Sequence, residues 1–196
     1  MTAEPVGPRG ATGAPRGSRS ADSALVSRLR GAIRDVPDHP KPGIVFKDIT
    51  PLLGDAELYR EACAALAAPF AAQGVTHVVA VESRGFLFGG PVATALGGGI
   101  VPVRKPGKLP YRSTREEYAL EYGTDALEMH EDALAHGARV LVVDDVLATG
   151  GTAGATVRLV ERAGAVVVGC AFVIELAFLG GRSALTGRRV EVILSY

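Results

Sequence analysis

Two adjacent carboxylates, Asp144 and Asp145, follow an apolar run at residues 140–143 and precede a loop of small residues. Apolar side chains recur at helical spacing from Val157 onward, which predicts a buried strand, a tight loop and a helix start. Open α/β sheets bind ligands at the carboxyl ends of their strands. Carboxylates there can accept hydrogen bonds from the vicinal hydroxyls of a ribose, with a metal ion nearby to soften their charge. The free N–H groups of the loop and the helix start suit a phosphate.

The pattern therefore indicates a ribose 5-phosphate site formed by Asp144, Asp145, Ala148, Thr149, Gly150, Gly151 and Thr152. A Walker A loop is excluded because no Gly-Lys-Ser/Thr occurs, and a dinucleotide fingerprint is excluded because the G-x-G-x-x-G spacing is missing. The alternative is an ordinary buried strand with a Gly-rich turn before a helix. Two adjacent acids at a strand end count against that alternative.

The composition favours one compact α/β domain. The chain has 196 residues, of which 47% are hydrophobic, enough to bury a substantial core. Its net charge of zero gives no argument for nucleic acid, and no apolar run is long enough to span a membrane. Cys63 and Cys170 lie in apolar stretches, as reduced core cysteines of a cytoplasmic protein do. The four histidines show no metal-ligand spacing.

Residues 1–20 are rich in Pro, Gly and Arg and nearly free of large apolar residues, so we predict a disordered tail before one domain at residues 21–196. A transit peptide is the alternative, although frequent Pro and Gly forbid the amphipathic helix that it needs.

Apolar periodicity predicts the elements of the domain. We expect helices from Asp22 or Ser23 to before Pro37 and over residues 55–73, and strands over residues 78–81, 100–103, 140–143, 166–176 and 190–194. This order predicts an α/β fold with a mostly parallel sheet flanked by helices on both faces. Residues 111–118 are polar without a core face, which predicts a mobile lid, and alternation over residues 119–128 predicts a β-hairpin arm.

Two segments resemble a known family. Residues 142–155 resemble the phosphoribosyl pyrophosphate signature of type I phosphoribosyltransferases, and residues 42–53 resemble the P-G-[IV]-x-F-[KR]-D-[IV]-[ST]-P-[IVL]-[LM] opening of the adenine phosphoribosyltransferases. The resemblance implies the type I fold with a small N-terminal hood at about residues 37–53. It also implies that Phe46 stacks on adenine, that the Val45 backbone reads the exocyclic amino edge, and that Lys47 lies near the base.

Two further loops carry the same resemblance. Residues 82–91 resemble the pyrophosphate loop of the family, and residues 104–110 match its R-K-x-G-K-L-P motif. The residues implied to hold pyrophosphate are Glu82, Ser83, Arg84, Gly85, Arg104, Lys105 and Lys108. The resemblance further implies a non-proline cis peptide between Glu82 and Ser83, and a homodimer.

The reaction implied by the resemblance converts adenine and 5-phosphoribosyl pyrophosphate into AMP and pyrophosphate, with Mg²⁺ carried by the substrate. Glu121 would be the general acid/base for a purine ring nitrogen, and Asp144, Asp145 and Arg84 would be the other catalytic residues. Tyr122 would belong to the lid. Two alternatives stay open: a non-catalytic sensor of phosphoribosyl pyrophosphate, and an enzyme of the same fold for another base. The neutral charge of the chain argues against the first, and the hood motif argues against the second.

Overall fold

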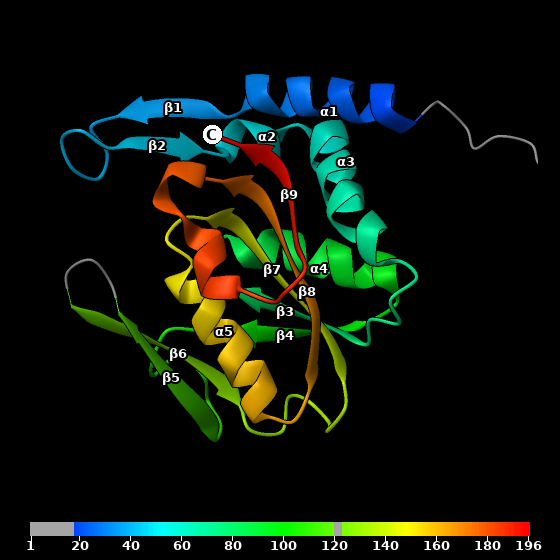
Figure 1. Ribbon diagram of the computed structural model, residues 1–196, viewed down its shortest axis with the longest axis vertical. Coiled ribbons are helices and arrows are strands. Elements are labelled where there is room, and N and C mark those ends of the chain that lie inside the picture. The colour runs from blue at the N-terminus through cyan, green and yellow to red at the C-terminus, as the bar shows by residue number, and fades with distance from the viewer. Residues whose placement is uncertain (1–17, 120–122) are drawn as a thin grey trace, which may run out of the picture.

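A parallel sheet of five strands organises the chain, as the computed structural model shows (Figure 1). The structure describes residues 18–119 and 123–196. Its helices are α1 (Ser18–Ala32), α2 (Thr50–Gly54), α3 (Ala56–Ala67), α4 (Gly85–Leu96) and α5 (Gly151–Arg162), with 3-10 helices η1 (Ala68–Phe70), η2 (Ala177–Leu179) and η3 (Gly181–Leu185). Its strands are β1 (Arg34–Pro37), β2 (Val45–Asp48), β3 (His77–Val81), β4 (Gly99–Val103), β5 (Ser113–Ala119), β6 (Thr124–His130), β7 (Arg139–Leu147), β8 (Val166–Glu175) and β9 (Val190–Ser195).

The five strands of the central sheet lie in the order β4-β3-β7-β8-β9, and every neighbouring pair is parallel. Successive side chains of β7 enter two different apolar clusters, Leu141 and Val143 in one and Val140 and Val142 in the other. Successive side chains of a strand point to opposite faces, so the sheet is buried on both faces. The predicted α/β fold with a parallel sheet flanked by helices is confirmed.

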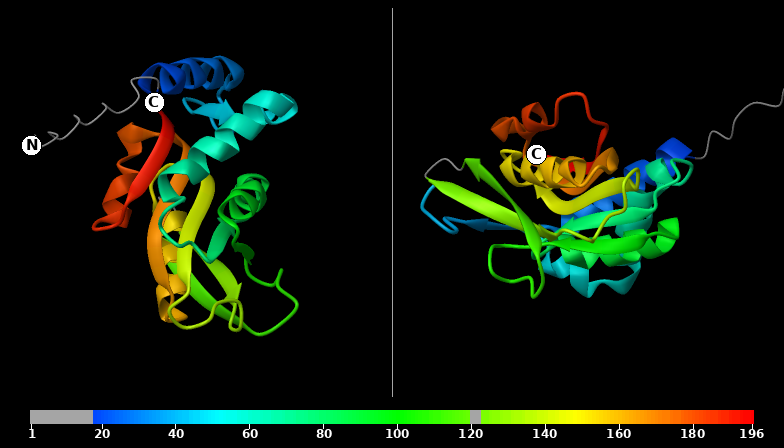
Figure 2. Two further views of the ribbon diagram at one scale, coloured as in Figure 1. Left: turned by 90° about the vertical axis from the view of Figure 1, so that its right-hand side faces the viewer. Right: turned by 90° about the horizontal axis from the view of Figure 1, so that it is seen from below.

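Helices lie on both faces of this sheet (Figure 2). Side chains of α1, α2, α3 and α4 join one apolar cluster, and those of α5 join the other together with side chains of β5 and β6. Helix α4 follows β3 and helix α5 follows β7, so both helices begin at the carboxyl edge of the sheet. Among the described helices, none has the length and apolar character needed to cross a membrane.

The hood is an antiparallel hairpin of β1 and β2, which lies beside the C-terminal residue (Figure 1). Its register pairs Asp35 with Lys47, and the Lys47 ammonium lies 2.6 Å from Asp35 Oδ1. The same ammonium lies 4.1 Å from the centre of the Tyr196 ring, and the Arg30 guanidinium of α1 lies 4.7 Å from that ring centre. These contacts tie the hood to α1 and to the end of β9.

The N-terminal region differs from the prediction in three ways. Helix α1 begins at Ser18, ahead of the start expected at Asp22 or Ser23, and it ends at Ala32, short of the end expected just before Pro37. Residues 34–37, placed in that helix by the prediction, instead form strand β1, because their pairing with β2 depends on the folded hood rather than on local periodicity. The tail predicted over residues 1–20 falls largely on residues 1–17, which lie outside the described residues.

The prediction that residues 111–118 lack a core face is wrong. Most of this segment forms β5, which pairs with β6 in a hairpin as the alternation over residues 119–128 indicated. Tyr118 is only 7% exposed and Glu116 only 9%. Glu116 is buried because its carboxylate pairs with Arg158 and Arg162 of α5, a tertiary contact that the sequence pattern does not contain.

Candidate active site

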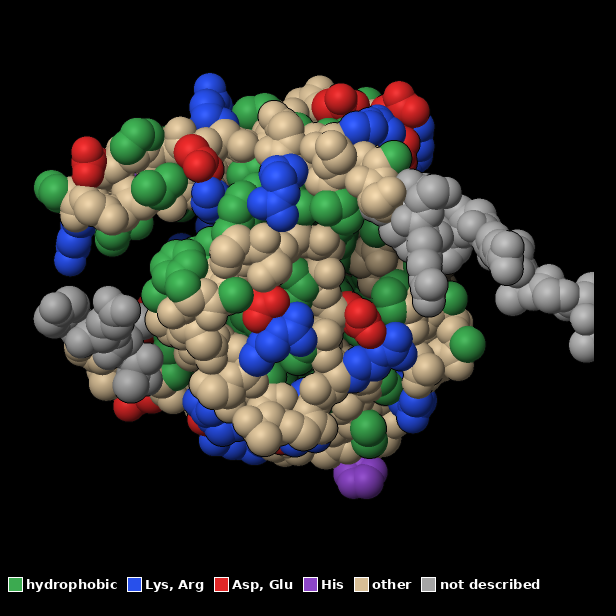
Figure 3. Space-filling view, turned by 45° about the horizontal axis from the view of Figure 1, so that its top comes forward, with side chains coloured by type: hydrophobic (Ala, Val, Ile, Leu, Met, Phe, Trp, Pro, Cys, Tyr) green, Lys and Arg blue, Asp and Glu red, His purple; other side chains and the backbone are tan. Residues whose placement is uncertain are grey.

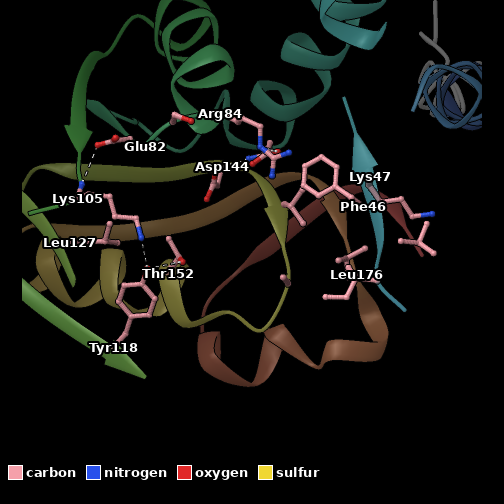
Figure 4. Close-up of a pocket in the computed structure, with 16 residues that line it drawn as sticks. Phe46, Lys47, Glu82, Arg84, Lys105, Tyr118, Leu127, Asp144, Thr152 and Leu176 are labelled. Carbon is pink, nitrogen blue, oxygen red and sulfur yellow. Dashed lines mark hydrogen bonds and ion pairs between the residues drawn. The ribbon is translucent and has the colours of Figure 1, made fainter. Parts of the chain in front are cut away.

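A cavity of about 440 Å³ opens at the carboxyl edge of the sheet, lined by the hood and by the segments that follow β3 and β7 (Figure 4). Most of the residues that line it were singled out in the sequence: Val45, Phe46, Lys47, Glu82, Ser83, Arg84, Lys105, Asp144, Asp145, Ala148 and Thr152. The fold therefore brings segments from four separate parts of the chain to one place.

The two carboxylates lie within β7, which continues to Leu147 because β8 pairs with it as far as Glu175. Arg84 Nε lies 2.9 Å from Asp145 Oδ2, the distance of an ion pair. The geometry at this contact does not give a hydrogen bond, so the buried Oδ2 has no hydrogen-bond partner within the described residues. A buried acceptor without a hydrogen bond is unusual in a folded protein, and a ligand hydroxyl would supply that bond beside the charge of Arg84.

The surroundings of these carboxylates disfavour their charged forms. Burial raises the pKa of Asp144 well above its usual range, and the neighbouring charge of Asp145 raises it further. Burial also raises the pKa of Asp145, although the Arg84 guanidinium opposes this shift. The pair is therefore suited to partners that donate hydrogen bonds or bring positive charge.

The turn after β3 lies directly against this pair. The peptide bond between Glu82 and Ser83 is cis, which confirms that prediction. Gly85 does not line the cavity, but a Cβ at this position would lie 2.8 Å from Asp144 Oδ1 and 3.0 Å from the Val143 carbonyl oxygen. A glycine is therefore needed here for the turn to approach the carboxylates.

The hood contributes an aromatic wall to the cavity. The Phe46 ring and the Arg84 guanidinium face each other in Figure 4, with 5.0 Å between the guanidinium carbon and the ring centre. His39 packs edge-on against the same ring at 5.1 Å. Hydrophobic side chains gather on the projecting hairpin in Figure 3, where Ile44 is 45% and Val45 is 48% exposed. An aromatic ring and apolar side chains beside an open cavity suit a flat heterocycle.

Lys47 lines the cavity, but its ammonium is directed away from Phe46 (Figure 4). The Asp35 carboxylate and the Tyr196 ring already engage that ammonium, as described for the hood. The structure thus gives the charge of Lys47 a role in holding the hood.

A smaller hollow of about 70 Å³ lies beside the main cavity, over the loop and first turn of α5. All five loop residues singled out in the sequence line it: Ala148, Thr149, Gly150, Gly151 and Thr152. Gly150 has φ of 83° and precedes the first residue of α5, so the free N–H groups of the helix start face this region. The hollow has the size and the donors that a phosphate group needs.

Carboxylates of the same chain hold the three cations of residues 104–108. Glu82 accepts hydrogen bonds from Arg104 Nε and from the Lys105 backbone N–H, both at 3.1 Å, and pairs with the Lys108 ammonium. Burial acts to raise the pKa of Glu82, but these hydrogen bonds outweigh it and lower the pKa. The Lys105 ammonium pairs with Asp125. Of the three cations, Lys105 lines the main cavity.

Tyr118 is a cavity residue that the sequence reasoning missed. Its hydroxyl donates to Asp125 Oδ2 at 3.1 Å. The same hydroxyl accepts from Thr152 Oγ1 at 3.4 Å (Figure 4). Tyr118 therefore links the β5–β6 hairpin to the loop under the smaller hollow. The only signal in the sequence was an aromatic residue in an otherwise polar segment. The apolar lining residues Leu127 and Val146 carried no signal of their own, whereas Leu176 ends a segment that resembles the V-I-E-L segment bordering the base pocket in the family.

Glu121 and Tyr122 lie outside the described residues, between β5 and β6. Within residues 18–119 and 123–196, no group of three or more His, Cys, Asp or Glu side chains is arranged to hold a metal ion. A divalent cation at this site would therefore need ligands from a substrate as well as from the protein.

The chain is similar to known proteins over most of its length. The family model of the phosphoribosyl transferase domain matches residues 55–185. An adenine phosphoribosyltransferase of Myxococcus xanthus is 59% identical over 175 residues, which cover 89% of this chain and 95% of that protein. The solved structure of adenine phosphoribosyltransferase from Rhodothermus marinus has a TM-score of 0.85 at 58% identity, with 89% of this chain and 99% of that chain covered.

Similarity extends to a structure that contains ligands. Adenine phosphoribosyltransferase of Saccharomyces cerevisiae, in complex with adenine and an imino-altritol bisphosphate, has a TM-score of 0.83 at 39% identity and covers 88% of this chain and 99% of its own. High identity across nearly the full length of these relatives shows that the chain belongs to the adenine phosphoribosyltransferase family.

Proposed function

We propose that the chain transfers the 5-phosphoribosyl group of 5-phosphoribosyl pyrophosphate to adenine, giving AMP and pyrophosphate. The observation that carries this proposal is that three binding features lie next to one another at one edge of the sheet. The Phe46 ring, the Asp144–Asp145 pair and the hollow over residues 148–152 suit a base, a ribose and a phosphate. The yeast relative in complex with adenine supports adenine as the base.

The carboxylate pair acts on the ribose. As the bond from ribose C1 to pyrophosphate breaks and adenine N9 attacks from the opposite face, positive charge develops on the ribose. Asp144 and Asp145 bind the ribose hydroxyls and stabilise this charge, and the unsatisfied Oδ2 of Asp145 supports this role. The five loop residues from Ala148 to Thr152 hold the 5-phosphate and fix the ribose for attack.

The cations act on the leaving group. The electron pair of the broken bond leaves with pyrophosphate, whose charge Arg84 and Lys105 stabilise from the cavity wall. Arg104 and Lys108 join them by exchanging the Glu82 carboxylate for pyrophosphate oxygens. The Ser83 and Gly85 backbones form the rest of the pyrophosphate loop.

The residues present fit a Mg²⁺ ion that arrives with the substrate. Mg²⁺ is commonly bound by one or two carboxylates together with phosphate oxygens, and Asp144 and Asp145 offer two carboxylates, the second of which has a buried oxygen without a hydrogen-bond partner. Mg²⁺ bound there neutralises charge on the pyrophosphate and orients the ribose hydroxyls.

Glu121 and Tyr122 complete the proposal on the strength of the family resemblance. Glu121 is the general acid/base for a purine ring nitrogen, and Tyr122 belongs to the lid that excludes water.

Selection of adenine rests on the hood. Phe46 stacks on the purine, and the Val45 backbone carbonyl accepts from the exocyclic amino group of adenine. The same carbonyl repels the oxo group that hypoxanthine carries at that position, so the base preference has a physical cause.

We also propose that the protein is a cytoplasmic homodimer. Leu87 of α4 is 43% exposed and Ile100 of the edge strand β4 is 47% exposed, which suits an apolar contact between subunits. Cys63 and Cys170 are free and buried, as expected in a reducing compartment. Analytical ultracentrifugation should give twice the mass of one chain, and a single-chain mass would contradict the dimer.

The deciding experiment measures pyrophosphate release with Mg²⁺ and 5-phosphoribosyl pyrophosphate, with adenine, hypoxanthine, guanine and orotate offered in parallel. We expect release with adenine alone. Turnover of another base would contradict the account of Val45 and Phe46. Tight binding of phosphoribosyl pyrophosphate without turnover of any base would contradict the enzyme and favour a sensor.

A further inference from the structure

An ion pair between the buried Glu175 and the half-exposed Arg182 lies outside the two cavities described above and joins η3 to the sheet. Glu175 ends β8 and is 7% exposed. Arg182 of η3 donates two hydrogen bonds to its carboxylate, from Nε to Oε1 at 2.7 Å and from Nη2 to Oε2 at 3.0 Å. Arg182 Nη1 also donates to the Val190 carbonyl oxygen of β9 at 3.3 Å. Two parallel hydrogen bonds fix direction as well as distance, so the beginning of η3 is held firmly against β8 and β9.

The residue before Arg182 touches the backbone of the loop that we assign to the 5-phosphate. A Cβ at Gly181 would lie 2.2 Å from the Ala148 carbonyl oxygen, and a Cβ at Gly150 would lie 2.3 Å from the Gly181 carbonyl oxygen. Neither position has room for a side chain, because the two backbones are in direct contact. The position of residues 148–150 is therefore set by the position of Gly181.

We infer that Glu175 and Arg182 are positioning residues for the 5-phosphate site. Neither lines the hollow over the loop, so neither touches the phosphate. Their ion pair holds Gly181 in place, and Gly181 holds the loop in the shape that directs its N–H groups at one anion. This inference rests on the proposed function, which assigns the loop to the 5-phosphate of the substrate.

Loss of the ion pair should loosen the loop without unfolding η3. Leu185 at the other end of η3 is 2% exposed and anchors that end in the core. Only the end next to Gly181 then gains freedom. When that end moves, the loop at residues 148–150 moves with it, and its N–H groups no longer point together at the phosphate. Substrate binding and catalysis then weaken, although neither Glu175 nor Arg182 touches the substrate.

Product inhibition tests the inference, because AMP carries the 5-phosphate and pyrophosphate does not. The variants are Glu175→Gln and Arg182→Lys, and the control is Glu61→Gln, which removes the exposed ion pair between Arg28 and Glu61. In Glu175→Gln we expect the KI of AMP and the KM of phosphoribosyl pyrophosphate to rise about ten-fold. The KI of pyrophosphate and the KM of adenine should change less than about two-fold, as should every constant of the control.

Arg182→Lys keeps the charge but loses the two parallel hydrogen bonds, so the KI of AMP should rise by an intermediate factor. A purely structural role would lower Tm and the active fraction while leaving the ratio of the two KI values unchanged. That unchanged ratio in a folded variant overturns the inference, and Arg182→Lys decides it should Glu175→Gln fail to fold. A wild-type protein that forms no AMP overturns the proposed function and this inference together, whereas an active wild type with an unchanged ratio in the variants overturns the inference alone.

Discussion

Asp144 and Asp145 place two carboxyl groups side by side in a buried strand, and burial raises the pKa of both. A raised pKa means that the folded protein disfavours the ionised form. The charge of Asp144 therefore lowers stability at pH values above its folded pKa, and this effect disappears below the pKa of the unfolded chain, about 3.9. Substrate-binding sites commonly retain residues that lower the stability of the fold, because activity depends on those residues.

Replacing Asp144 with asparagine should separate stability from activity. Asn Oδ1 can still accept the hydrogen bond that the Asp145 N–H donates to Asp144 Oδ1, so the strand keeps its local structure. We expect the free energy of unfolding at pH 7.5 to rise by about 1–2 kcal/mol, and kcat to fall by roughly 10²–10³-fold. Urea denaturation and steady-state kinetics measure the two effects.

Asp145→Asn is the matched variant for this prediction. Arg84 already opposes the pKa shift of Asp145, so its gain in stability should be smaller than that of Asp144→Asn while the loss of turnover remains large. The stability gain of Asp144→Asn should also shrink as the pH falls towards 4, because wild-type Asp144 is then protonated. A gain that is constant with pH, or undiminished turnover in either variant, would contradict this account.

Phe46→Ala should weaken the use of adenine selectively. The ring faces the cavity and stacking on a base is worth about 1–3 kcal/mol, so the KM of adenine should rise by roughly 10–100-fold. The KM of phosphoribosyl pyrophosphate should rise by a smaller factor, because Phe46 meets the pyrophosphate loop through Arg84, which Asp145 also holds. Phe178→Ala, which truncates a ring that is 76% exposed, is the control. Equal increases in both KM values would show that Phe46 supports the cavity as a whole.

At the scale of elements, the Glu116 carboxylate ties the β5–β6 hairpin to α5. Glu116 of β5 accepts from Arg158 Nε at 2.5 Å and also pairs with Arg162, while its own side chain is 11% exposed. The hydrogen bond from Arg158 is the main cause that lowers the pKa of Glu116, and burial opposes it. Because α5 begins at the phosphate hollow, this contact sets the hairpin over the cavity.

Glu116→Gln should lower the free energy of unfolding by about 1–2 kcal/mol, since two arginines lose a buried charged acceptor but remain half-exposed to water. A lowered pKa contributes stability above the unfolded value, about 4.3, and that contribution is lost as the pH falls through the folded pKa. The difference in free energy of unfolding between Glu116→Gln and wild type should therefore be largest at pH 7 and shrink below pH 4. Glu117→Gln, which removes an exposed pair with Arg115, is the control and should stay within about 0.5 kcal/mol of wild type. If the difference does not change with pH, the lost stability comes from side-chain packing and not from the charge of Glu116.

Periodicity predicted the buried elements well and the contacts between them poorly. The strands expected at residues 78–81 and 140–143 lie within His77–Val81 and Arg139–Leu147, because a strand buried on both faces is a continuous apolar run. Strand β1 and the core face of β5 were missed because each depends on a partner distant in sequence. The bracing of the phosphate loop by Gly181 was missed for the same reason.

For the molecule as a whole, the sequence predicted which residues meet at the site better than it predicted their orientation. Arg84, Asp144 and Thr152 do line one cavity, since the carboxyl ends of the parallel strands β3 and β7 share one edge, and Phe46 of the hood lines the same cavity. The Lys47 ammonium faces away from the cavity because Asp35 and Tyr196 bind it there. Partners of this kind come together only in the folded molecule, so they leave no local sequence pattern.

Removal of residues 1–17 should leave catalysis unchanged. The lining residues of both cavities lie between positions 44 and 176, and the composition of residues 1–17 gives them little apolar surface to bury. We expect kcat/KM for both substrates to stay within about two-fold of the full chain, and Tm to shift by less than about 2 °C. A larger loss in either quantity would assign these residues a role in the folded domain.

The stacking of Arg30 and Lys47 on Tyr196 has a practical consequence for handling the protein. A purification tag fused after Tyr196 would start beside the β1–β2 hairpin, which we propose binds adenine. The tag would crowd that hairpin or loosen the Tyr196 ring from Arg30 and Lys47. A cleavable tag fused ahead of residue 1 would join the chain well before Ser18, where α1 begins. Kinetic comparisons between variants are therefore best made on protein tagged at the N-terminus.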